Sequence, residues 1–281
     1  MDQIRIVTDS SADIPPQVVR ELGITVVPLA VIFGERTFDD GALSHDEFWR
    51  LARGPVTPKT SQPPIGVFER VYRQLVDAGH RVLCITLTSH HSGTFGCAWG
   101  AAEGFGDRVV VEDSRALSLG HGWQVIRAAR LALQGVSMEA ILSALRAMRE
   151  RTHFFIEFDS LHNLRHGGRA SKLMPAIDRL THALNLKVLI NLVDGELKIL
   201  GVARSYQKGI ERIKEEVARL GPLEHLAVAH TRRPDMGAEL ANALAALTRT
   251  PRANVLVFET GAVISCHAGE GLIAAVAVQV G

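Results

Sequence analysis

The sequence predicts an α/β protein of two domains, the first with a doubly wound, mainly parallel sheet and the second with a mixed or antiparallel sheet. Two observations support this fold class. In the first half, short apolar runs typical of buried strands alternate with helical patterns. In the second half, an Asp-Gly turn joins two apolar runs, which is a strong signal for an antiparallel hairpin. The pattern of expected elements changes near Arg151, which predicts domains at 1–151 and 152–281.

The first domain follows a strand-helix rhythm. Strands are expected at 4–8, 82–87 and 109–111, and helices at 16–23, 44–54, 63–79, 92–104 and 120–135. Proline at the start and glycine at the end mark several of these helices. Ser44 and Glu47 have the spacing of a capping box at the start of one of them.

The second domain begins with a strand expected at 153–158. The hairpin strands are expected at 187–193 and 197–202, around Asp194-Gly195. Helical patterns at 205–220 and 234–247 then alternate with apolar runs at 226–229, 255–258 and 273–276. The mixture of a hairpin with helix-linked strands predicts the mixed sheet.

The composition is that of a soluble globular chain with a substantial core. Of its 281 residues, 47% are hydrophobic and 22% charged, and the net charge of +1 argues against nucleic acid as a partner. No apolar run approaches the roughly 18 residues that span a bilayer, and the N-terminal residues lack the pattern of a signal peptide, so a cytoplasmic protein is expected. Cys84, Cys97 and Cys266 lie far apart without metal-type spacing, which predicts neither a disulfide framework nor a metal site.

A turn rich in hydroxyl groups follows the strand expected at 82–87. Open parallel sheets bind ligands at the carboxyl ends of their strands. Ser92, Gly93 and Thr94 lie where the next helix should begin, so hydroxyls and unpaired backbone N–H groups meet there and suit a carboxylate or phosphate. Serine is also a common helix cap, and this plainer interpretation stays open.

Two other segments carry similar donors. Thr60 and Ser61 precede the helix expected after Pro63, although Ser and Thr before proline are ordinary caps as well. His267 lies between an expected apolar strand and a glycine-bearing loop, where its imidazole can donate to a carboxylate. A lone histidine is also often structural.

An ordered set of short motifs runs along the chain. They are Ile6-Val7-Thr8-Asp9-Ser10-Ser11-Ala12-Asp13, Val26-Val27-Pro28-Leu29, Thr60-Ser61-Gln62-Pro63, Ser92-Gly93-Thr94, Asp113-Ser114, Gly167-Gly168-Arg169, Asp194-Gly195 and the loop at His267. With this set the chain resembles the DegV family of bacterial fatty-acid-binding proteins over nearly its whole length.

The resemblance implies two α/β domains that enclose a long-chain fatty acid between them, with no other cofactor, no metal and no catalytic residue. It also implies a carrier subunit of a fatty acid kinase, which presents the acyl carboxylate to a separate ATP-binding protein and makes transient contact with a membrane surface. The family's carboxylate contacts correspond to Thr60, Ser61, the Ser92-Gly93-Thr94 turn and His267. Arg169 and Arg204 correspond to basic positions that would serve the kinase or the acyl phosphate.

The chain departs from the family pattern at two places beside the expected head-group site. Thr88-Ser89-His90-His91 stands where relatives often have Ser-Ser-Gly-Leu. The familiar His-Thr-Gly-Pro-Gly loop appears as His267-Ala268-Gly269-Glu270-Gly271, with Glu270 expected to face solvent. The first departure leaves the role of His90 and His91 unexplained.

Other functional classes remain as alternatives. A Ser92–His267 dyad would make a hydrolase of acyl esters, although the chain has no Gly-x-Ser-x-Gly elbow and no assigned acid at this point. His162 and His166 have a spacing that suits a metal together with Asp159. Asp9 suggests an aspartyl nucleophile, but we expect it to cap a helix. ATP binding is not expected because no phosphate-cradling loop with a lysine occurs, and a pure protein-interaction role is the residual alternative.

Overall fold

The computed structural model describes residues 3–184 and 186–281. The chain divides into two compact units. The N-terminal unit contains the chain up to Glu150 together with Gly261–Val263, and the C-terminal unit contains Arg151–Thr260 and Ile264–Gly281. The chain therefore returns to the N-terminal unit for three residues near its end.

The N-terminal unit is built on a four-stranded sheet in which every pairing is parallel. The strand order is β2-β1-β6-β7. The bounds are β1 (Ile4–Asp9), β2 (Thr25–Val27), β6 (Arg81–Thr86) and β7 (Val109–Asp113). The parallel sheet predicted for the first half is confirmed.

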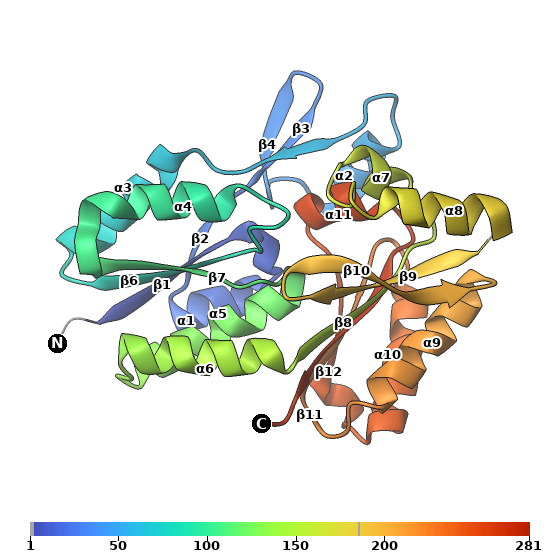
Figure 1. Ribbon diagram of the computed structural model, residues 1–281. Coiled ribbons are helices and arrows are strands. Elements are labelled where there is room, and N and C mark those ends of the chain that lie inside the picture. Colours follow the sequence, from blue (N-terminus) through green and yellow to red (C-terminus); the bar gives the residue numbers. More distant parts are fainter. Residues whose placement is uncertain (1–2, 185) are drawn as a thin grey trace. The chain divides into compact units, whose positions relative to one another are not determined.

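Helices cover both faces of this sheet (Figure 1). On one face, α1 (Pro16–Leu22), α5 (Ser118–Leu133) and α6 (Met138–Glu150) pack against Leu83 and Ile85 of β6. On the other face, α3 (Ile65–Asp77) and α4 (Thr94–Ala102) pack against Val82 and Cys84. Successive side chains of a strand point to opposite faces, so one fully buried strand supplies both halves of the core.

A small antiparallel sheet accompanies the parallel one and was not expected. Its order is β4-β3-β5, with β3 (Ala30–Phe33), β4 (Arg36–Asp39) and β5 (Lys59–Ser61). These strands have only three or four residues each, so they show too few alternations to stand out in the sequence. The next helix, α2 (His45–Ala52), begins at the predicted capping box of Ser44 and Glu47.

The C-terminal unit has a six-stranded mixed sheet in the order β10-β9-β8-β13-β11-β12. Its strands are β8 (Thr152–Glu157), β9 (Lys187–Val193), β10 (Glu196–Ala203), β11 (Leu223–His230), β12 (Val255–Glu259) and β13 (Ile273–Gln279). Only the β11–β12 pairing is parallel among these described strands. The predicted hairpin is confirmed: Asp194 and Gly195 both have positive φ, as a type I′ turn requires.

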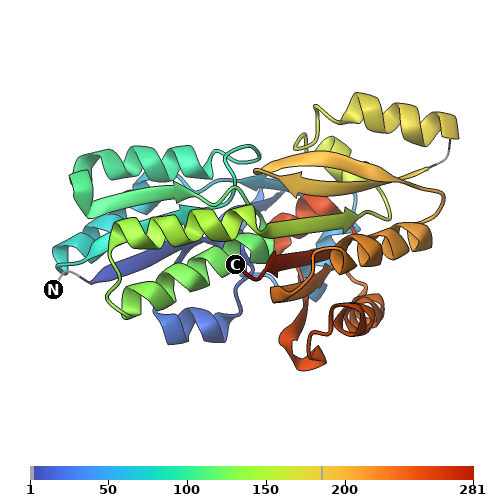
Figure 2. The same ribbon diagram turned by 60° about the horizontal axis from the view of Figure 1, so that its bottom comes forward.

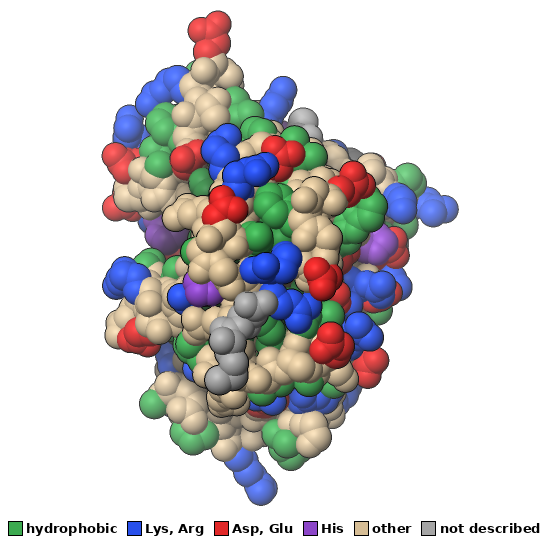
Figure 3. Space-filling model, turned by 90° about the vertical axis from the view of Figure 1, so that its left-hand side faces the viewer, with side chains coloured by type: hydrophobic (Ala, Val, Ile, Leu, Met, Phe, Trp, Pro, Cys, Tyr) green, Lys and Arg blue, Asp and Glu red, His purple; other side chains and the backbone are tan. Residues whose placement is uncertain are grey.

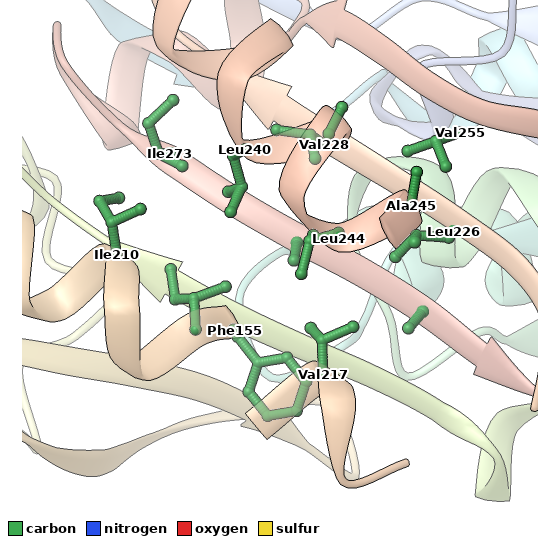
Figure 4. Close-up of a cluster of buried hydrophobic side chains, with 14 of the residues drawn as sticks. Phe155, Ile210, Val217, Leu226, Val228, Leu240, Leu244, Ala245, Val255 and Ile273 are labelled. Carbon is green, nitrogen blue, oxygen red and sulfur yellow. The ribbon is translucent and has the colours of Figure 1, made fainter. Parts of the chain in front are cut away.

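The core of this unit lies on both faces of the sheet. On one face, α9 (Tyr206–Ala218) and α10 (Pro234–Thr248) pack on Phe155, Val228 and Ile273, as Figure 4 shows. On the opposite face lie α7 (His162–His166) and α8 (Met174–Leu184) (Figure 2). The mixed α/β architecture predicted for the second half is therefore confirmed.

One element differs in type from the sequence expectation. The apolar run before His267 was expected to be a strand, but it forms helix α11 (Ala262–Ala268). A short apolar run does not distinguish a strand from a buried helix by periodicity. Here the backbone amides at 261–263 donate hydrogen bonds to carboxylates of residues far away in the sequence. Local sequence patterns do not reveal such contacts.

The surface carries charges of both signs. On the face seen in Figure 3, acidic and basic side chains are intermixed and hydrophobic side chains are scattered between them. Within the described part of the chain, no helix has both the length and the apolar character needed to cross a membrane.

Candidate functional site

The Ser92-Gly93-Thr94 turn leads directly into α4. The hydroxyls of Ser92 and Thr94 are 2.8 Å apart, and the Thr94 amide donates to Ser92 Oγ at 3.2 Å. Gly93 is the residue before the helix and offers no side-chain cap. Ser92 is partly buried and Thr94 is fully buried, so Ser92 carries the accessible hydroxyl at the start of α4, where the first backbone N–H groups of a helix favour an anion.

Thr60 and Ser61 lie on β5, where Thr60 pairs with Val31 of β3. Ser61 is exposed, and its hydroxyl donates to the carbonyl of Gln62 at 3.2 Å. Pairing with β3 fixes the backbone of this segment while leaving the Ser61 side chain at the surface.

Gln62 brings these two segments together. A Cβ atom on Gly93 would lie 2.7 Å from Gln62 Nε2, so the absence of a side chain at Gly93 permits the contact. Gln62 Nε2 also donates to Cys97 Sγ at 3.7 Å, one turn into α4. The structure therefore places the Thr60-Ser61 segment next to the Ser92-Gly93-Thr94 turn within one unit.

His267 lies near the end of α11, in the C-terminal unit. A Cβ atom on Gly167 would lie 2.5 Å from His267 Nδ1, so the ring packs directly on the glycine backbone. The Asn163 amide donates to the carbonyl of Cys266 at 3.1 Å and holds the same helix. The Gly167-Gly168-Arg169 motif and the His267 loop are thus neighbours, a relationship that the sequence did not reveal.

Arg169 and Arg204 are both exposed and lie in different surroundings. Arg169 donates to the carbonyl of Gly167 at 2.8 Å, and its charge partly offsets the burial that raises the pKa of Cys266 to about 12. Arg204 follows β10 and lines a hollow of about 430 Å³ together with Leu186, Val202 and Ala203.

The Thr88-Ser89-His90-His91 loop is held mainly through its backbone. The Ser89 amide donates to Asp113 Oδ2 at 3.2 Å, and the His90 amide donates to Thr88 Oγ1 at 3.3 Å. Thr88 is buried, whereas Ser89 and His90 are exposed. The loop therefore has a defined backbone next to the Ser92 turn. Glu270 is exposed, as expected.

Sequence reasoning missed a set of carboxyl groups with raised pKa values, of which Asp13 and Asp40 are partly buried and Glu157 is fully buried. Burial raises the pKa of Asp13 to about 7, against hydrogen bonds from Ser118 and Gly261 that lower it. Burial also raises the pKa of Asp40 and, in the C-terminal unit, that of Glu157 to about 8. Asp13 belongs to one of the family motifs, but nothing in the local pattern distinguishes Glu157 from an exposed residue at a strand end.

The contacts of these residues do not support the alternative hydrolase, aspartyl-nucleophile and metal-binding functions. Ser92 Oγ is hydrogen-bonded to the hydroxyl and the amide of Thr94. Neither group is a general base that could activate Ser92 as a nucleophile. Asp9 caps a short 3₁₀ helix, Ser10–Ala12, as expected, and accepts from Ser11. Among the described residues no group of three or more His, Cys, Asp or Glu side chains is placed to hold a metal. The side chain of His166 lies outside the described part of the chain.

Known proteins resemble this chain along its whole length. The model of the DegV family, described as uncharacterised, matches residues 3–280. The DegV domain-containing protein YejH of Lactococcus lactis is 33% identical over 273 residues, which is 95% of this chain and 96% of that protein.

Solved structures give the same picture. A DegV family protein from Thermus thermophilus, described by its fatty acid binding, is 32% identical with a TM-score of 0.88, covering 99% of this chain and 100% of that one. DegV from Bacillus subtilis, described as a fatty acid binding protein, is 30% identical with a TM-score of 0.86 and the same coverage. A stearic acid-binding protein from Eubacterium ventriosum is 26% identical, with a TM-score of 0.85 and 99% coverage of both chains.

Proposed function

This chain belongs to the DegV family, and on that basis we propose that it binds a long-chain fatty acid in an apolar tunnel and presents the acyl carboxylate to a fatty acid kinase. The observation that carries the proposal is the meeting of two hydroxyl-bearing segments at Gln62 and Gly93, beside the first turn of α4. Relatives with the same fold over the whole chain are described as binding fatty acids.

In this proposal the carboxylate is bound by hydrogen-bond donors without a buried arginine. Thr60, Ser61 and the Ser92-Gly93-Thr94 turn supply hydroxyl and amide donors, and His267 supplies an imidazole. A hydrogen bond to a charged group contributes about 1.5 to 3 kcal/mol. A few such bonds orient the head group and leave its oxygen available for reaction.

The acyl tail supplies most of the affinity. Each buried methylene contributes about 0.8 kcal/mol, so a chain of about fifteen carbons gives on the order of 10 kcal/mol before the entropic cost of binding. Partly buried apolar side chains are available on the α7 and α8 face of the C-terminal sheet. They include Leu161, Leu173, Met174, Leu180 and Phe258.

The kinase role requires a partner that supplies ATP, because the chain has no phosphate-cradling loop with a lysine. In the transfer, a carboxylate oxygen bonds to the γ-phosphorus of ATP and ADP leaves, which yields an acyl phosphate. We assign Arg169 and Arg204 to contact with the kinase or with this anionic product, since both are exposed cations.

Equilibrium binding of radiolabelled palmitic acid tests the head-group assignment. Ser92→Ala and His267→Ala are expected to weaken binding by roughly tenfold or more each, from the loss of one charged hydrogen bond. Ser89→Ala is the matched control, because its exposed hydroxyl lies in the adjacent loop and is assigned no contact with the acid. Unchanged binding in both variants contradicts the assignment. Hydrolysis of an acyl ester that Ser92→Ala abolishes would instead establish the hydrolase.

A further inference from the structure

Two carboxylates of the N-terminal unit hold the first turn of α11. The Gly261 amide donates to Asp13 Oδ1 at 2.9 Å, and the Val263 amide donates to Asp40 Oδ1 at 3.3 Å. The Ala262 amide also donates to Asp40. The first N–H groups of a helix have no partner within it, so Asp13 and Asp40 act as caps supplied from distant parts of the chain.

The two carboxylates are themselves fixed by serine hydroxyls. Ser118 Oγ donates to Asp13 Oδ2 at 2.5 Å, and Ser10 donates to Asp40. The approach of the helix backbone is close, since a Cβ atom on Gly261 would lie 2.9 Å from Asp13 Oδ1. Glycine at 261 is therefore a steric requirement of this arrangement.

We propose that Asp13 and Asp40 are positioning residues that hold α11, the helix that carries His267. The link to ligand binding rests on the proposed function, in which His267 contacts the carboxylate. The positioning of α11 itself does not depend on it.

Hydrogen exchange of the peptide that spans 261–268 tests the positioning role in the lipid-free protein. Asp13→Ala removes the acceptor of the Gly261 amide, so protection of this peptide should fall by roughly tenfold. Asp13→Asn keeps an acceptor oxygen for Gly261 and should retain most of the protection. Asp39→Ala, at an exposed neighbouring position, is the control and should behave like the wild type.

Gly261→Ala provides a second test. Its Cβ would clash with Asp13 Oδ1, so the 261–268 peptide should lose protection. Wild-type protection in Asp13→Ala or in Gly261→Ala overturns the positioning role.

Palmitic acid binding separates this inference from the proposed function. Asp13→Ala should bind the acid more weakly than the Asp39→Ala control, and Asp13→Asn should bind it nearly as well as the wild type. If exchange follows the expected pattern but these variants bind the acid equally, α11 is positioned by Asp13 and the link to His267 is wrong. A protein that takes up no acid while exchange still follows the pattern contradicts the proposed function alone.

Discussion

Asp13 and Ser118 are joined by a 2.5 Å hydrogen bond, and both have a left-handed backbone, with φ of 50° and 47°. This conformation costs a non-glycine residue about 1 to 2 kcal/mol. Because two such residues are in direct contact, the surrounding fold must hold their backbone in this conformation. The carboxylate of Asp13 also accepts a hydrogen bond from the Gly261 amide. The start of α5 and the start of α11 are therefore both fixed at Asp13.

Substitution of Ser118 separates the hydrogen bond from the backbone strain. Ser118→Ala should lower the free energy of unfolding by about 1 to 3 kcal/mol, because the partly buried carboxyl of Asp13 loses its donor. Ser118→Gly loses the same donor but adopts positive φ freely, so it should be about 1 kcal/mol more stable than the alanine variant. Urea denaturation measures both values, and an alanine variant as stable as the glycine variant would show that the φ of Ser118 carries no cost.

Glu157 should make the protein less stable as pH rises. Neither of its carboxyl oxygens has a hydrogen-bond partner among the described residues, and burial raises its pKa from 4.5 to about 8. The folded state therefore holds a proton that the unfolded chain releases, so stability is highest below about pH 4.5 and is lost progressively up to about pH 8.

The isosteric variant Glu157→Gln should remove this part of the pH dependence. We expect it to raise the free energy of unfolding by a few kcal/mol at pH 8 relative to the wild type, with little gain at pH 4.5. Denaturant titrations at the two pH values measure the difference, with the exposed Glu35→Gln as the control. The same gain at both pH values would mean that Glu157 does not titrate in this range.

Gly167 should be required for the position of His267. In Gly167→Ala the new Cβ would lie 2.5 Å from His267 Nδ1, so the imidazole must move. We expect palmitic acid binding to weaken by roughly tenfold, as for loss of one charged hydrogen bond. Gly201→Ala is the matched control in the same unit, because nothing lies within 4 Å of its new Cβ. Equal binding by the two variants would remove His267 from the head-group site.

Much of the fold could be predicted because its signals are local. The Asp194-Gly195 hairpin follows from turn chemistry, and α2 follows from the Ser44–Glu47 capping box. Helix α11 could not be predicted in this way. The amides at its start donate hydrogen bonds to Asp13 and Asp40, which lie more than two hundred residues earlier in the chain. The small sheet of β3, β4 and β5 was missed because its strands are too short to show a period.

The candidate site could likewise be predicted only in part. The hydroxyls of Ser61 and Ser92 were visible as donors before helix starts. Their proximity depends on the contact of Gln62 with Gly93, which only the fold reveals. Glu157 gave no signal at all, because its burial follows from the packing of α9 on β8, where a Cβ at Gly209 would meet its carboxyl oxygen at 2.5 Å.

Native mass spectrometry of the purified protein, before and after extraction with organic solvent, tests the central claim most directly. Binding of a long-chain fatty acid predicts a mass excess of one acid per chain, which disappears on extraction and returns when labelled palmitic acid is added. A protein that is free of lipid as purified and takes up no labelled acid would contradict the account.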